Sequence, residues 1–84
     1  MGKKVLVEVL VPAAGKAYDV YIPLESRLYE VIGVLSKLIT DLAEGSYRAL
    51  EGTVLCDREA NIVYNMNLRV EELGIHNGSR LMLT

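Results

Sequence analysis

The sequence predicts an α+β fold in which one long helix packs across a mixed sheet of four to five strands. Between residues 26 and 45, apolar residues recur at the i, i+3, i+4 and i+7 spacing of a helix with one buried face. Segments with period-two alternation precede this stretch, and shorter apolar segments follow it. A helix with a single apolar stripe has to be covered by another layer, which the strands supply. The stripe consists of Leu28, Val31, Ile32, Leu35, Leu38, Ile39 and Leu42.

The two ends of this helix carry the residues that helix ends favour. Ser26 can accept a hydrogen bond from a free backbone N–H in the first turn. Glu25 and Glu30 place negative charge near the positive end of the helix dipole. Gly45 supplies a residue that readily adopts the left-handed conformation at a helix end. The helix is therefore expected from Ser26 to Gly45.

The first strand is expected at Lys4–Val11. Its four valines alternate with Leu6, Glu8 and Leu10, so the valines form one face of the strand and the other three residues form the second. Because Glu8 is charged, the second face is assigned to solvent and the valine face to the core.

A second strand is expected to pair with the first as a hairpin. The proline and glycine in residues 12–16 predict a turn, and residues 18–22 then alternate as a strand. Asp19 marks the outward face of this strand, so Tyr21 is expected to point outward beside Leu6 or Leu10.

A third strand is expected after the helix, following a connector at residues 46–50. In residues 52–57, Val54 and Cys56 are expected to point inward. The polar neighbours of Leu55 place its side chain on the outer face of the predicted sheet.

Three short elements complete the predicted fold. Residues 62–64 are expected to form an edge strand, and residues 68–73 a single helical turn whose apolar side chains cover the open end of the core. Arg80–Leu83 is the last strand, with Leu81 and Leu83 inward and Met82 outward.

A hairpin, one long helix and a closing strand in the middle of the sheet together form the β-grasp arrangement. The first and last strands are expected to be parallel neighbours, in the order second, first, fifth, third. Residues 1–84 are expected to form a single domain, because a chain this short has only one small core.

Composition excludes several classes of function. Nine basic and eleven acidic residues, with no basic cluster beyond Lys3 and Lys4, argue against a nucleic-acid-binding surface. One cysteine allows no internal disulfide, so a reducing compartment is favoured and a cytoplasmic location is expected. No apolar segment is long enough to cross a bilayer, so direct membrane insertion is not expected.

Residues for catalysis or cofactor binding are sparse. His76 is the single histidine and lies in a predicted turn, where a solvated imidazole is the simplest interpretation. Cys56 lies in an apolar strand without a basic neighbour on its own face, as inert structural thiols do. No metal-ligand cluster or phosphate-binding loop is present, so neither an enzyme nor a cofactor is predicted.

The predicted outer face of the sheet is the remaining candidate site. With the β-grasp strand order, five apolar side chains become neighbours where solvent is expected. Scattered exposed apolar residues are ordinary in monomers, so the alternative is that this face has no role. The functional interpretation is a surface that binds a protein partner or a second copy of the chain. The candidate residues are Leu6, Leu10, Tyr21, Leu55 and Met82.

The element order and the pattern Gly-Ile-x-Asn-Gly-x-Arg-Leu at residues 74–81 resemble ubiquitin-like proteins. More narrowly, the sequence resembles the YukD/EsaB family, small ubiquitin-like proteins of type VII (Esx) secretion in Gram-positive bacteria. Ser79 departs from the acidic residue expected in that family. The resemblance implies a non-catalytic, cytoplasmic accessory or regulatory protein whose partner is a component of the membrane secretion machine.

Two alternatives within the same fold remain open. The chain can be the ubiquitin-like cytoplasmic domain of a larger membrane secretion component, although the Met1 start favours a free-standing protein. A protein modifier or sulfur carrier needs a flexible tail that ends in Gly-Gly. The sequence ends at Thr84 directly after the last predicted strand, so this function is expected only for a truncated chain.

Overall fold

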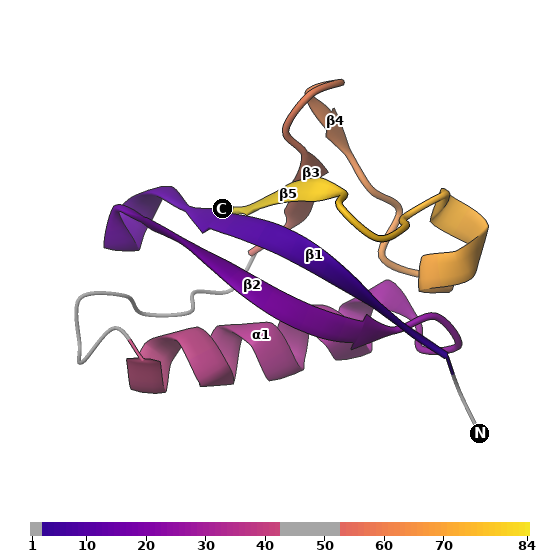
Figure 1. Cartoon of the computed structure of the whole chain (residues 1–84), viewed down its shortest axis with the longest axis horizontal. Coiled ribbons are helices and arrows are strands. Elements are labelled where there is room, and N and C mark those ends of the chain that lie inside the picture. The colour runs from indigo at the N-terminus through magenta and orange to yellow at the C-terminus, as the bar shows by residue number, and fades with distance from the viewer. Residues whose placement is uncertain (1–2, 43–52) are drawn as a thin grey trace.

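The computed structural model describes residues 3–42 and 53–84, which form a mixed sheet with one α-helix across one of its faces (Figure 1). The predicted β-grasp arrangement is confirmed. The predicted helix end at Gly45, the connector at residues 46–50 and the start of the third strand lie outside the described residues. The elements are β1 (Lys4–Val11), the 3-10 turn η1 (Pro12–Ala14), β2 (Lys16–Pro23), α1 (Leu28–Leu42), β3 (Leu55–Asp57), β4 (Ile62–Val63), the 3-10 turn η2 (Val70–Leu73) and β5 (Arg80–Leu83).

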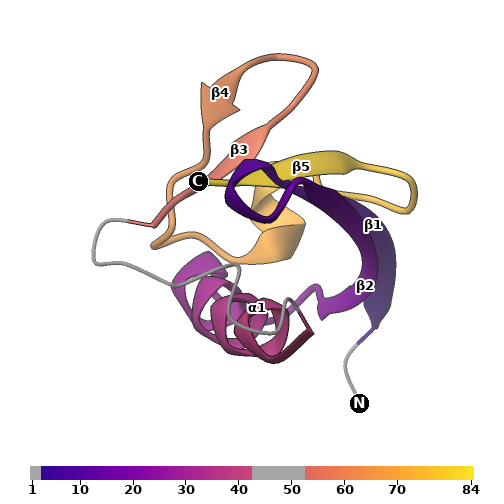
Figure 2. The ribbon, with the colours of Figure 1, turned by 90° about the vertical axis from the view of Figure 1, so that its left-hand side faces the viewer.

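The sheet has the strand order β2-β1-β5-β3-β4 within the described residues. The central β1 and β5 are parallel, and every other neighbouring pair is antiparallel. Figure 2 looks nearly along the axis of α1 and shows the sheet curving over the helix. The predicted parallel pairing of the first and last strands is therefore confirmed.

The core lies between the sheet and α1 and is aliphatic. The valine face of β1 is buried along its whole length, as its alternation predicts. The stripe of α1 packs against it through five of the seven predicted positions, and β5 adds its two inward leucines. These core residues are Val5, Val7, Val9, Val11, Leu28, Val31, Ile32, Leu35, Ile39, Leu81 and Leu83.

The start of α1 differs from the sequence expectation. The carbonyl of Arg27 accepts the first helical hydrogen bonds, from the N–H groups of Glu30 and Val31, at 3.0 and 3.3 Å. Glu30 Oε1 in turn accepts the N–H of Arg27 at 3.3 Å, as in a capping box. Ser26 is therefore not the capping residue. Its carbonyl instead accepts the N–H of Val70 at 3.0 Å, which links the helix entry to η2.

Leu38 is the second departure from the predicted helix. The sequence stripe places it in the core, but its side chain is 40% exposed. It faces an apolar groove between β2 and α1, because β2 is the last strand on this side and leaves that flank of the helix uncovered. The side chain of Leu42, the last residue of the predicted stripe, lies outside what the structure describes.

The face of β3 is the third departure. Leu55 is 0% exposed and belongs to the core, whereas the sequence places it outward. Directly opposed residues of neighbouring strands point to the same face. Leu55 lies opposite the inward Leu83, and Cys56 lies opposite the outward Met82. The pairing with β5 therefore sets the orientation of β3, and it reverses the orientation inferred from the neighbours of Leu55 in the sequence.

The remaining short elements follow the sequence expectation. Val70 of η2 is fully buried, so the helical turn covers the open end of the core as predicted. Backbone hydrogen bonds from Val70 to Ser26 and from Glu71 to Leu24, each 3.0 Å long, hold this turn against the helix entry. The predicted edge strand is β4, whose two residues are both exposed.

The position of Leu55 gives a test of this core. Leu55→Ala is expected to lower the free energy of unfolding by about 2–5 kcal/mol, because it leaves a cavity beside Leu83. Val63→Ala, at a side chain that is 59% exposed, is expected to change it by less than about 0.5 kcal/mol. Urea unfolding followed by circular dichroism measures both. Equal small effects would contradict the inward orientation of Leu55.

Candidate docking surface on the outer face of the sheet

One apolar residue from each of the five described strands lines up across the outer face of the sheet. Ala17 lies opposite Leu10, Leu10 opposite Met82, Met82 opposite Cys56, and Cys56 opposite Val63. We call these five residues the outer row. They come from β2, β1, β5, β3 and β4 in that order, so the row spans the full width of the described sheet.

Solvent reaches the outer row unevenly. Ala17 and Val63 are exposed at its two ends, Leu10 and Met82 are half-buried, and Cys56 is buried. Alternation places an apolar side chain at the same point on five neighbouring strands, on the face that the helix does not cover. A contiguous apolar strip on a solvated sheet face is typical of a protein-binding surface.

A polar row separates the outer row from a second apolar pair. Leu6 lies opposite Tyr21, which is 68% exposed, on the same face. Between them and the outer row lies Glu8, which is opposite Asp19 on one side and Arg80 on the other. Two carboxylates directly opposed repel each other. An ion pair between Arg58 Nη1 and Glu8 Oε1 offsets this repulsion.

The structure therefore groups four of the five residues predicted for partner binding on one face. Leu10 and Met82 belong to the outer row, whereas Leu6 and Tyr21 lie beyond the Glu8–Arg58 ion pair. Leu55 is not part of the face, because its side chain lies in the core. Sequence analysis missed Ala17, Cys56 and Val63 as members of this surface. Pairing β3 with β5 by their leucines would have found Cys56 and then its β4 neighbour Val63.

A hydrogen-bonded turn holds β4, and with it Val63, beside β3. Asp57 Oδ1 accepts the N–H groups of Glu59 at 2.9 Å and Ala60 at 3.2 Å, and Tyr64 Oη donates to Asp57 Oδ2 at 3.3 Å. The bond from Ala60, followed by the bond from Glu59, lowers the pKa of Asp57. Burial and then the negative charge of Asp57 raise the pKa of Tyr64 to about 12.

Groups that carry out covalent or metal chemistry do not gather on this face. His76 is exposed, and its Nδ1 lies 2.8 Å from the carbonyl oxygen of Asn77. Within residues 3–42 and 53–84, no three histidine, cysteine or acidic side chains form a possible metal site. None of the described helices is long and apolar enough to cross a membrane. The chemistry that this face offers is apolar contact bordered by charged groups.

The strand order and the helix across the sheet are those of the ubiquitin-like β-grasp fold. The chain matches the EccD5 ubiquitin-like domain from Mycobacterium xenopi with a TM-score of 0.78 and 23% identity, over 98% of this chain and 93% of that one. It matches the ubiquitin-like domain of the Mycobacterium tuberculosis type VII secretion system protein EccD1 with a TM-score of 0.66 and 15% identity, over 98% of both chains. A third similar structure is a chain of the MycP5-free ESX-5 inner membrane complex, with a TM-score of 0.68 and 17% identity, over 96% of this chain and 20% of that one.

The same fold also occurs outside secretion systems. A toluene 4-monooxygenase complex contains a chain that matches with a TM-score of 0.76 and 11% identity, over 96% of both chains. No protein-family profile and no curated protein matches the sequence. At these identities the comparisons establish the ubiquitin-like fold, and function has to be argued from the surface.

The Asp57–Tyr64 contact predicts how stability changes at alkaline pH. The pKa of Tyr64 rises from 10.0 to about 12 on folding, so the folded protein keeps a proton that the unfolded chain releases. The free energy of unfolding is therefore expected to fall as pH rises from 10 to about 12. Tyr64→Phe is expected to remove this part of the decline, and urea titrations across that range measure it. Asp57→Asn is expected to keep part of it, because burial remains. Parallel curves for wild type and Tyr64→Phe would contradict this account.

Proposed function

We propose that residues 1–84 form one ubiquitin-like domain that acts as a non-catalytic accessory or regulatory module of a bacterial type VII secretion system. In this proposal the module lies on the cytoplasmic side of the membrane. It binds a protein component of the membrane-embedded secretion machine through the outer face of its sheet. Neither a cofactor nor nucleic acid takes part.

The observation that carries this proposal is the outer row. Its exposed and half-buried members contribute methyl and thioether groups on a face that the helix leaves open. Methionine and tyrosine are common in protein interfaces: Met82 belongs to the outer row, and Tyr21 lies on the same face beyond the polar row. The polar row of Asp19, Glu8 and Arg80, together with Arg58 paired to Glu8, gives a partner charged groups with which to fix its orientation. The likeness to EccD domains supports the choice of secretion system.

The proposal has two forms: the module is either a separate protein or one domain of a longer chain. The finer form is a free-standing YukD/EsaB-like protein of a Gram-positive bacterium, which the pattern at residues 74–81 supports. The other form is a ubiquitin-like domain within a larger membrane component. The ESX-5 match supports this second form, because the chain corresponds to 20% of the matched chain there, whereas it spans 93% of the EccD5 chain and 98% of the EccD1 chain. An antibody against these residues, used on membrane and supernatant fractions of the source cells, separates the forms by the mass and location of the detected band.

Substitutions in the outer row test the proposed docking. Leu10→Asp, Met82→Asp and Val63→Asp are each expected to weaken copurification of the protein component of the membrane-embedded secretion machine by about tenfold, because each places a charge in the apolar contact. The measurement is affinity capture of the tagged chain from detergent-solubilised membranes. Tyr29→Asp is the matched control, because Tyr29 is half-exposed on α1, on the other side of the sheet.

Folding is checked separately for each variant by urea unfolding. Val63→Asp is the decisive variant, because its exposed position tolerates a charge in the folded state. Wild-type recovery of secretion components by a folded Val63→Asp and a folded Met82→Asp would remove the basis of the proposal. A concentration-dependent dimer that the same substitutions abolish would assign the surface to self-association instead.

A further inference from the structure

The free edge of β2 presents backbone groups in a fixed pattern. The N–H of Leu24 donates to the carbonyl of Lys3 at 2.9 Å, which identifies this pair as hydrogen-bonded in the β1–β2 ladder. Such pairs alternate along an antiparallel ladder, so the N–H and C=O groups of Ala17, Asp19 and Tyr21 point away from β1. None of these groups has a backbone partner within residues 3–42 and 53–84.

The β1 side of the ladder shows the same alternation. Leu6 and Glu8, which lie opposite Tyr21 and Asp19, use their backbone groups on the β5 side of β1. The N–H of Leu6 donates to Asn77 Oδ1 at 2.8 Å, and the N–H of Glu8 donates to the carbonyl of Ser79 at 3.0 Å. The outward groups of β2 are therefore left for a strand that the described part of the chain does not supply.

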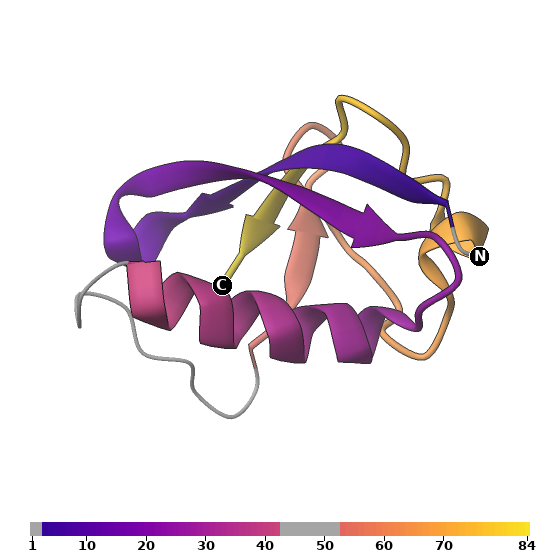
Figure 3. The same ribbon diagram turned by 60° about the horizontal axis from the view of Figure 1, so that its bottom comes forward.

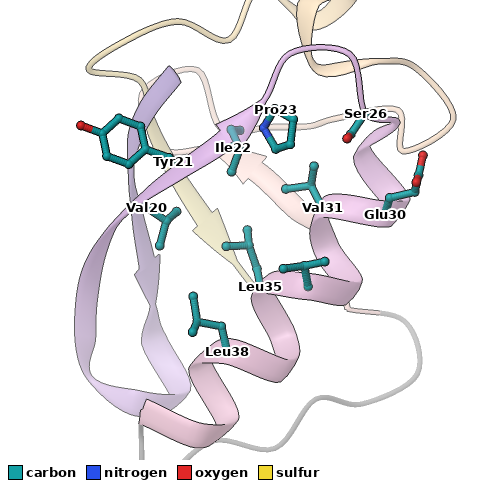
Figure 4. A pocket seen from close by; sticks show the side chains of 10 residues that line it. Val20, Tyr21, Ile22, Pro23, Ser26, Glu30, Val31, Leu35 and Leu38 are labelled. Atoms are coloured by element: carbon teal, nitrogen blue, oxygen red, sulfur yellow. The ribbon is translucent and has the colours of Figure 1, made fainter. Parts of the chain in front are cut away.

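An apolar groove lies directly beside this edge, between β2 and α1. Figure 3 shows β2 running alongside the helix, and Figure 4 shows Val20, Ile22, Leu35 and Leu38 pointing into the space between them. Val34 also lines the groove and is 68% exposed, so the helix flank beyond the core carries apolar side chains that no described element covers.

The volume and the charge of the groove indicate which kind of ligand fits it. Its volume of about 200 Å³ is below the roughly 300 Å³ at which small-molecule pockets begin, but it accepts a few aliphatic side chains. Glu30 is the one charged residue among those that line it, and Asp19 projects from the outer side of the same edge. Arg27, near the same end, donates through Nη1 to the carbonyl of Asn67 at 2.6 Å. Among the outward residues Ala17, Asp19 and Tyr21 of the edge strand, Asp19 carries the charge, so the outer side of this edge presents a carboxylate.

We propose that the β2 edge and its groove bind an extended segment of another protein as a sixth strand, with aliphatic residues at alternate positions and lysine or arginine between them. The aliphatic side chains lie on the helix side of the sheet and enter the groove against Val34 and Leu38, whereas the basic side chains point to the outer side of the edge, beside Asp19. A symmetric pairing of two β2 edges centred on Asp19 would place two carboxylates opposite each other, which favours a basic partner over a second copy. The β2 edge shares Ala17 with the outer row, but the proposed strand uses backbone groups and the groove beside α1, and it does not depend on the proposed function.

A synthetic octapeptide of alternating valine and lysine, acetylated and amidated, is the probe. Titration into the ¹⁵N-labelled chain is expected to protect the amides of Ala17, Asp19 and Tyr21 from hydrogen exchange. A peptide with glutamate in place of lysine is expected to bind about tenfold more weakly or not at all, because its carboxylates lie beside Asp19 with like charge. Equal binding of both peptides would overturn the proposal.

N-methylated peptides test strand addition without altering the protein. In an antiparallel addition the lysine N–H groups bond to β2, and in a parallel addition the valine N–H groups do so. N-methylation of either the lysines or the valines is therefore expected to weaken binding by about tenfold or more, while N-methylation of the other residue type is tolerated. The residue type whose methylation weakens binding identifies the strand direction. Equal affinity of both methylated peptides and the parent peptide would exclude a backbone ladder and overturn the proposal.

Two exposed positions of α1 supply a matched pair of protein variants. Val34→Lys is expected to weaken peptide binding by about tenfold, because it fills the groove and repels the basic peptide, whereas Tyr29→Lys, outside the groove, is expected to leave binding unchanged. Three results would overturn the proposal: no binding at millimolar peptide, shifts centred on Leu10 and Met82, or the same amide protection arising from a dimer without peptide.

Discussion

The parallel pairing of β1 with β5 is the contact on which the rest of the structure depends. It joins the two ends of the described chain in the middle of the sheet, with Val9 opposite Leu81 and both side chains fully buried. Asn77 lies in the turn before β5, and its Oδ1 accepts the N–H of Leu6. The side chain therefore continues the contact with β1 beyond the start of β5. A slip of one residue would exchange the two faces of β5. The same register therefore fixes both the core and the surface on its opposite face.

The sequence predicts which face is buried in those elements whose apolar pattern repeats several times. The valines of β1 repeat over a whole strand, and the apolar stripe of α1 repeats over four turns, so their faces were predictable. β3 is only three residues long, and Leu55 and Cys56 are both apolar, so local pattern does not distinguish its faces. The contact with Leu83 makes that choice, and no local rule contains it. Leu38 was wrongly assigned to the core for a related reason. Periodicity shows which helix residues are apolar, but it does not show how much of the helix the sheet covers.

The candidate surface was predictable as a face but not as a set of residues. Alternation along β1 and β5 predicted Leu10 and Met82 correctly as outward residues. Their alignment into one row depends on register across five strands, which the sequence of each strand leaves open. The pattern at residues 74–81 serves the junction of β5 with β1 through Asn77, and Gly78 there has a φ of 87°. The most specific part of the resemblance is thus tied to forming the fold, which unrelated functions share.

Pro23 at the end of β2 limits how far the sheet can grow. Its position in the β1–β2 ladder turns its missing N–H toward the free edge, so the ladder with β1 loses nothing. Beyond Tyr21, the edge has a carbonyl but no donor to offer a neighbouring strand. At the opposite edge, β4 is two residues long and leads into a turn. Pro23 therefore confines strand pairing at the β2 edge to the segment from Ala17 to Tyr21, and a short edge of this kind is a poorer template for edge-to-edge aggregation than a long, regular one.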